Sequence, residues 1–158
     1  MPKHRDRPES HAVTVTQNRV LRAHEYKQMS KLALVTAVRQ LFKHRKWCQG
    51  YNAGNAAGLP VSPLSSDAVE WCLRGACIKV LEPSLSVITV DLHMESSQIS
   101  RFIAAAFGFD TSRKMVQWND TQGRIKDEII ALCKSRMKEY RWDYDQEIVA
   151  ENATGEEA

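Results

Sequence analysis

The amino-acid sequence predicts a mainly α-helical protein, a compact single-domain bundle of four to five helices. Three observations support this fold class. Apolar residues recur every three or four positions in several long stretches, which is the periodicity of helices that bury one face. The chain has 158 residues, 43% hydrophobic and 26% charged, enough for one hydrophobic core in an ordinary globular protein. Its seven glycines and five prolines are too few for a fibrous or low-complexity chain.

The first helix is expected within Arg19–Lys46. There Leu34, Val38, Leu41 and Phe42 recur at three- and four-residue intervals, and no glycine or proline interrupts them. Gly50 supplies a stop. The stretch that follows, 51–63, is rich in glycine and proline and predicts a loop or a short hairpin.

The second helix is expected from about residue 65 to Leu81. Ser65-Ser66-Asp67 followed by Glu70 is a helix-start signal, because short polar side chains accept hydrogen bonds from the first free N–H groups. Gly75 in the middle costs about 1 kcal/mol relative to alanine, so we expect a close neighbour there, with the ring of Trp118 as the candidate.

Two more helices follow. The third is expected from Ser97 and ends at Gly108, and the last runs from about Arg124 to Tyr140. Between the second and third helices, Ser86–Leu92 is rich in β-branched residues and remains open between strand and helix.

Charge is unevenly distributed, although the net value is +3. Met1–Lys46 has eleven lysines and arginines against three acids, whereas Glu139–Ala158 has seven acids against one arginine. We therefore expect a basic flexible arm at 1–16, a helical globular domain at 17–140 and an acidic, disordered tail at 141–158.

The sequence favours a cytoplasmic protein without a membrane span or cofactor. No apolar run approaches the ~20 residues that a span requires, and no apolar stretch follows the basic N-terminus as in a secretory signal.

The four cysteines have no Cys-x-x-Cys spacing, and we interpret them as buried free thiols. A zinc site would need scattered ligands to converge, and His44 with Cys48 is the only close pair. The cysteines are Cys48, Cys72, Cys77 and Cys133.

Three short segments centred on tryptophan stand out: Trp47-Cys48-Gln49-Gly50, Trp71-Cys72-Leu73-Arg74-Gly75-Ala76 and Trp118-Asn119-Asp120. Together they resemble an uncharacterised family of small bacterial and bacteriophage proteins with Trp-x-Gln-Gly, Trp-Cys-x-x-Gly-Ala and Trp-Asn-Asp segments, the last before a final helix. The resemblance covers roughly residues 34–132 and implies no activity. Many relatives place a threonine after the arginine of the last motif, whereas this chain has Arg124-Ile125, so the helix cap is expected further upstream, at Asp120 or Thr121.

The signature residues have two interpretations. In the structural one, they lock the helices together, and Asn119 and Asp120 satisfy the free N–H groups of the last helix. In the functional one, Asn119 and Asp120 bind a polar ligand or act in acid–base chemistry. We favour the first, because the carboxylate has no visible partner. The signature residues are Trp47, Gly50, Trp71, Cys72, Gly75, Trp118, Asn119 and Asp120.

Candidate binding residues gather near the end of the first helix. Arg39, Lys43 and Lys46 fall within a narrow arc of a helical projection, with Arg45 adjacent in sequence, and these residues could bind a partner or nucleic acid, or be a solvated helix end.

No phosphate-binding, metalloprotease or hydrolase motif is present. The sequence thus favours a non-enzymatic, protein-binding accessory or inhibitor protein, phage-encoded and acting on a host defence or nucleic-acid-processing complex, with self-association also possible. The alternatives are a nucleic-acid-binding protein that uses the basic arm and first helix, and an unrecognised enzyme centred on Asn119 and Asp120.

Overall fold

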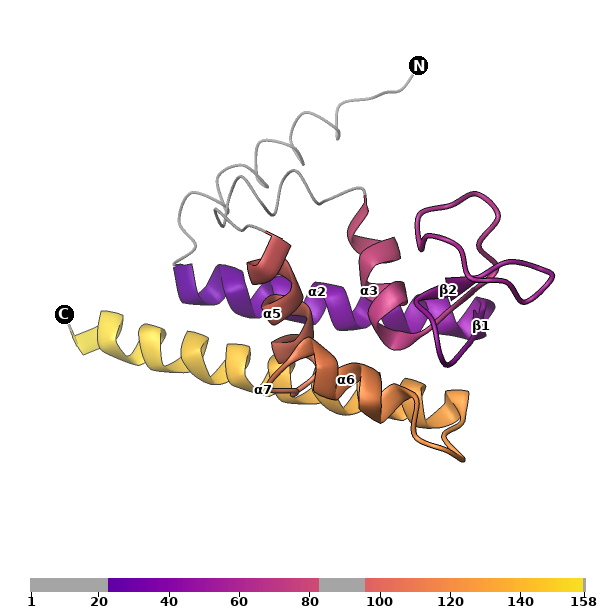
Figure 1. The fold of residues 1–158 in the computed structure, drawn as a ribbon. Coiled ribbons are helices and arrows are strands. Elements are labelled where there is room, and N and C mark those ends of the chain that lie inside the picture. Colours follow the sequence, from indigo (N-terminus) through magenta and orange to yellow (C-terminus); the bar gives the residue numbers. More distant parts are fainter. Residues whose placement is uncertain (1–22, 83–95, 158) are drawn as a thin grey trace, which may run out of the picture.

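The computed structural model describes residues 23–82 and 96–157, which form five helices and one small sheet (Figure 1). This confirms the mainly α fold. The helices are α2 (Ala23–His44), α3 (Leu73–Leu81), α5 (Ser96–Ala106), α6 (Ser112–Asn119) and α7 (Lys126–Glu157). The strands are β1 (Lys46–Trp47), β2 (Ala53–Gly54) and β3 (Glu70–Trp71).

The two long helices α2 and α7 lie antiparallel against each other and form the base of the molecule (Figure 1). α2 buries Val38 and Phe42, and α7 buries Ile129 and Cys133, all at 0% exposure. The shorter helices α3, α5 and α6 cover this pair. The four-residue spacing of each buried pair is the periodicity that predicted both helices.

The sheet lies at the end of α2 and has β3 in its centre, parallel to β1 and antiparallel to β2. The expected Gly/Pro-rich loop or hairpin is present: β2 lies inside it, and Gly54 forms an isolated antiparallel bridge with Pro60.

The prediction that the second helix starts at Ser65-Ser66-Asp67 is wrong. α3 begins only at Leu73, with Cys72 as its N-cap. Glu70 and Trp71 are extended because their backbone pairs with strands on both sides, and the Trp71 Nε1–H donates to the Pro63 carbonyl at 3.0 Å. Pairing with two segments distant in sequence outweighs a local helix-start signal.

The sequence did not predict α6, and this changes the place of the last tryptophan motif. Trp118 and Asn119 end α6 instead of preceding α7. The expected cap of the last helix at Asp120 or Thr121 is therefore wrong. α7 begins after Ile125, whose N–H donates to the Glu128 carboxylate at 3.0 Å, which is the glutamate half of a capping box.

The last helix continues far beyond Tyr140, where we expected it to end. α7 reaches Glu157, so the acidic segment that we expected to be disordered is helical. Tyr140, Tyr144 and Ile148 recur at four-residue spacing and are at least partly buried, which gives this part of the helix an apolar face despite its charge.

The third helix is confirmed as α5, and Gly108 after it has a φ of +85°, the left-handed conformation expected of a helix-ending glycine. Two predictions lie outside the described residues, namely the basic arm at 1–16 and the open choice for Ser86–Leu92. Within the described residues, no helix is long and apolar enough to cross a membrane.

Candidate functional site

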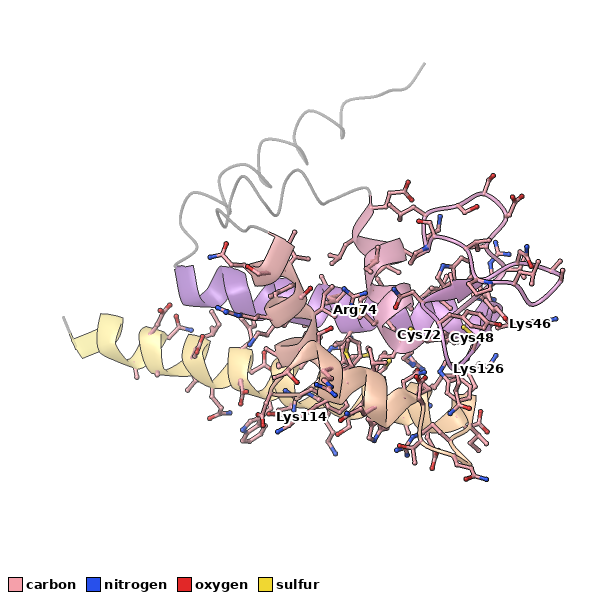
Figure 2. The ribbon with its side chains drawn as sticks, viewed as in Figure 1. Lys46, Cys48, Cys72, Arg74, Lys114 and Lys126 are labelled. Atoms are coloured by element: carbon pink, nitrogen blue, oxygen red, sulfur yellow. The ribbon has the colours of Figure 1, made fainter. Side chains whose placement is uncertain are left out.

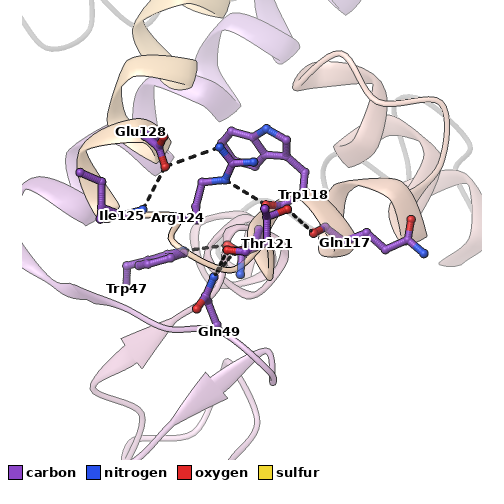
Figure 3. Close-up of polar contacts among 9 residues, drawn as sticks. Trp47, Gln49, Gln117, Trp118, Thr121, Arg124, Ile125 and Glu128 are labelled. Carbon is purple, nitrogen blue, oxygen red and sulfur yellow. Dashed lines mark hydrogen bonds and ion pairs between the residues drawn. The ribbon is translucent and has the colours of Figure 1, made fainter.

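The three tryptophan segments, far apart in sequence, meet in one place that we call the motif junction: residues 47–50, 71–73 and 118–121. Trp47 and Trp71 are register partners on the parallel strands β1 and β3. The end of α6 brings Asn119 against Trp47 and Leu73, and Figure 3 shows part of the resulting hydrogen-bond network.

Asn119 is the centre of the junction and is completely buried. Its Oδ1 accepts from the Trp47 Nε1–H at 2.7 Å and from the Leu73 backbone N–H at 2.9 Å. Its Nδ2 donates to the Cys48 carbonyl at 3.2 Å and to the Asp120 carboxylate at 2.9 Å. An asparagine amide offers two donors and two acceptor positions, and all four are used here. Asn119 therefore has no free group with which to bind a ligand.

A second layer of hydrogen bonds closes the junction. Asp120 accepts from the Gly50 backbone N–H at 3.1 Å, in addition to Asn119. The Gln49 Nε2 donates to the carbonyls of Asn119 at 2.8 Å and Thr121 at 2.9 Å (Figure 3). These contacts explain the residue types: an amide, a carboxylate and a glutamine tie the first segment to the end of α6.

Trp118 lies on the other side of this turn, packed against Phe109 and Arg124. The Arg124 guanidinium lies 4.0 Å from the Trp118 ring centroid, and its Nε–H donates to the Trp118 carbonyl at 3.0 Å. Arg124 also pairs with Glu128 at 3.5 Å. The cation–π contact and the ion pair connect the end of α6 to the start of α7.

Gly75 has a different neighbour from the one we expected. A Cβ at this position would lie 1.9 Å from the Asn52 carbonyl oxygen, so it is the backbone of the loop, not the Trp118 ring, that requires glycine here. That carbonyl accepts the Cys72 backbone N–H at 3.0 Å. Gly75 thus allows the loop to sit against the first turn of α3.

All four cysteines are buried and free, as predicted. Burial raises the pKa of Cys48 and of Cys133 to about 12 and raises the pKa of Cys72 and Cys77 as well. His44 and Cys48, the close pair noted in the sequence, have different partners, because the His44 ring contacts Gln40 and the Cys48 thiol faces the Tyr51 carbonyl.

We expect the protein to lose stability at alkaline pH. An unfolded thiol has a pKa near 9.0, whereas Cys48 and Cys133 keep their protons to about pH 12 in the folded chain. Between these values the unfolded chain binds fewer protons. The free energy of unfolding therefore falls as pH rises above about 9, by up to about 1.4 kcal/mol per pH unit for each thiol.

Urea unfolding with reductant at pH 8, 9 and 10 measures this slope, with Cys133→Ala as the control that should flatten it. A free energy of unfolding that stays constant from pH 8 to 10 would contradict the expectation.

The structure separates the four basic candidate residues. Arg39 is half-buried, its Nε has no hydrogen-bond partner in the described part of the chain, and its charge only partly opposes the rise that burial causes in the pKa of Cys133. Lys43, Arg45 and Lys46 are exposed. Lys126 joins them, because its Nζ donates to the Arg45 carbonyl at 3.2 Å (Figure 2). The sequence could not reveal this, since Lys126 is 81 positions away.

A second exposed feature was also missed because its helix was expected to be disordered. On α7, Trp142 is 64% and Val149 is 61% exposed, and they lie seven residues apart on one face. Next to Trp142 is an open hollow of about 450 Å³. Its lining residues are Ser135, Lys138, Glu139, Trp142 and Asp145. We call this surface the α7 outer face.

The described residues thus define a small helical domain in which the most distinctive sequence motifs build a buried structural junction. Among them, no group of three or more histidine, cysteine or acidic residues could hold a metal ion.

Residues 27–136 match the family of unknown function DUF6197, and the chain belongs to this family. All three tryptophan segments fall inside the matched range. No curated protein and no solved structure matches the chain.

Proposed function

We propose that this protein is a non-enzymatic, protein-binding accessory protein that binds its partner with the α7 outer face. The observation that carries the proposal is the exposure of Trp142, at 64%. Tryptophan is enriched at the centres of protein interfaces, and exposing so large an apolar side chain to water is unfavourable. Val149, one heptad further on, extends the apolar surface.

The motif junction supports this proposal because its side chains form their hydrogen bonds within the protein. A catalytic pair needs a group with a free lone pair or a transferable proton at neutral pH. Asn119 uses its whole hydrogen-bonding capacity within the protein, and the exposed Asp120 accepts from Asn119 and from the Gly50 N–H through one carboxylate oxygen, so the two side chains do not act together as a free catalytic pair. The thiols have raised pKa values and stay protonated. We therefore assign the junction to stability and the binding function to the surface.

The charge of α7 indicates the chemistry of the partner. Residues 139–158 have seven acids against one arginine, and Asp145 borders the hollow. A complementary partner is a basic protein. It inserts an apolar side chain beside Trp142 and places lysine or arginine near Asp145. On this proposal the protein acts in the cytoplasm on a host complex, and a phage origin with a defence or nucleic-acid-processing target fits the resemblance seen in the sequence.

The test compares three forms of the full chain as bait in host lysate at physiological salt: wild type, Trp142→Ala and Leu59→Ala. Leu59 is a matched control, because it is 60% exposed but lies in the loop between β2 and β3. We expect one basic protein to bind wild type and Leu59→Ala but not Trp142→Ala. With that protein purified, Trp142→Ala should weaken binding at least about tenfold, as for a central tryptophan.

Two outcomes would overturn the proposal. Equal capture by all three forms would remove the α7 outer face from the interaction. Loss of the captured protein after nuclease treatment would mean that nucleic acid bridges the two proteins, and would favour binding through Lys43, Arg45, Lys46 and Lys126.

A further inference from the structure

Cys48 and Cys72 occupy matching positions on neighbouring strands. The parallel register pairs Lys46 with Glu70 and Trp47 with Trp71, so the next pair in this register is Cys48 with Cys72. Cys48 directly follows the last paired residue of β1, and its N–H donates to the Trp71 carbonyl at 3.0 Å as one of the bonds of the Trp47–Trp71 pair. Register partners on parallel strands lie about 4.8 Å apart and direct their side chains to the same face.

The two thiols also share their surroundings. The Cys48 Sγ lies 3.6 Å from the Tyr51 carbonyl oxygen, and the Cys72 Sγ lies 3.6 Å from the Asn52 Oδ1, the next residue along the chain. Figure 2 labels both cysteines near the sheet. A disulfide requires Cα atoms roughly 4.4–6.8 Å apart, and the strand spacing falls in this range.

We infer that Cys48 and Cys72 are a redox-active pair that closes to a disulfide in the folded protein and locks β1 to the start of α3. The structure shows the reduced state, with both thiols free. The pair lies under the motif junction, where the Cys48 carbonyl accepts from Asn119 and the Cys72 thiol caps α3. The bond would join the first two tryptophan segments covalently.

The oxidant is a disulfide of low molecular mass. Cys72 is the first nucleophile, because its Sγ accepts the Gly75 N–H at 3.3 Å, and this contact partly offsets the rise that burial causes in the pKa of its thiol. The Cys72 thiolate attacks the small disulfide and expels one small thiolate, and the Cys48 thiolate then attacks the mixed disulfide and expels the second. The protein loses two electrons and two protons, and the small disulfide becomes two thiols.

The reaction should be slow at neutral pH, since both sulfurs are buried, with residue exposures of 7% for Cys48 and 3% for Cys72. The closed loop would span about 25 residues, for which the chain-entropy relation gives a rise of roughly 7–14 °C in melting temperature.

The experiment treats the folded full chain with 2-hydroxyethyl disulfide at pH 8.5, followed by thiol counting in denaturant, non-reducing peptide mapping and a melting curve. We expect two of the four thiols to disappear, a peptide linking Cys48 to Cys72, and a raised melting temperature that dithiothreitol reverses. Cys77→Ala/Cys133→Ala retains only the proposed pair and should form the same link. Cys48→Ala should form none.

Retention of all four thiols in the folded wild type would overturn the inference. So would a link that involves Cys77 or Cys133, or a Cys48–Cys72 link that lowers the melting temperature. If the double variant does not fold, the peptide map of the wild type decides alone.

Discussion

Asn119→Ala is expected to lower the free energy of unfolding by about 3–5 kcal/mol, the largest effect that we expect of a single polar substitution among the described residues. The substitution removes four hydrogen bonds and leaves the Trp47 Nε1–H, the Leu73 N–H and the Cys48 carbonyl without their partner. Each unsatisfied buried group costs roughly 1–3 kcal/mol. Urea unfolding followed by circular dichroism measures the loss.

Gln117→Ala is the matched control. Gln117 is exposed on α6, two residues before Asn119, and its side chain forms no hydrogen bond within the described residues, since the Thr121 hydroxyl donates to its backbone carbonyl. Its substitution should change the free energy of unfolding by less than about 0.5 kcal/mol. If Asn119→Ala were as mild as this control, the junction would not stabilise the fold, and a binding role for Asn119 would regain support.

Gly75→Ala is expected to destabilise the protein by about 3 kcal/mol or more, although alanine is the better helix former by about 1 kcal/mol. The new Cβ would lie 1.9 Å from the Asn52 carbonyl oxygen, and backbone cannot move aside as a flexible side chain can. The loop would have to separate from α3, with loss of the Cys72 N–H bond to that carbonyl. Thermal or urea unfolding tests this directly.

Gly123→Ala provides the comparison. Gly123 has a φ of +85° and nothing within 4 Å of an added Cβ, so its substitution costs only the backbone strain, about 1 kcal/mol. If Gly75→Ala lowered the free energy of unfolding no more than Gly123→Ala does, the expectation would be contradicted. That result would show that the loop packed against α3 can shift to make room for the Cβ.

Helical periodicity correctly predicted the parts of the fold that depend on local sequence. α2 and α5 have long amphipathic repeats, and α5 ends at a glycine as expected. The prediction errors occurred where contacts with segments distant in sequence determine the local structure. Glu70 and Trp71 are extended because two strands pair with them, and α6 has only eight residues, too few for a clear period.

The sequence singled out residues of the motif junction but did not predict their geometry. It favoured a structural role for Asn119 and Asp120, yet placed them at the start of the last helix, whereas Asn119 ends α6. Their partners are Trp47, Gln49 and Gly50, about 70 positions away, and no local pattern reveals such contacts. Trp142 was missed because the acidic composition of its segment was interpreted as disorder. The helical spacing of apolar residues nevertheless continues through that segment.

The central claim is that the tryptophan segments are one packed structural unit centred on Asn119, and a double-mutant cycle tests it most directly. The cycle measures urea unfolding of the wild type, Trp47→Phe, Asn119→Ala and the double variant. Trp47→Phe removes the donor of the 2.7 Å bond but keeps an aromatic ring. We predict that the double variant loses about 1–2 kcal/mol less than the sum of the two single losses. Losses that add to within about 0.3 kcal/mol would contradict the claim.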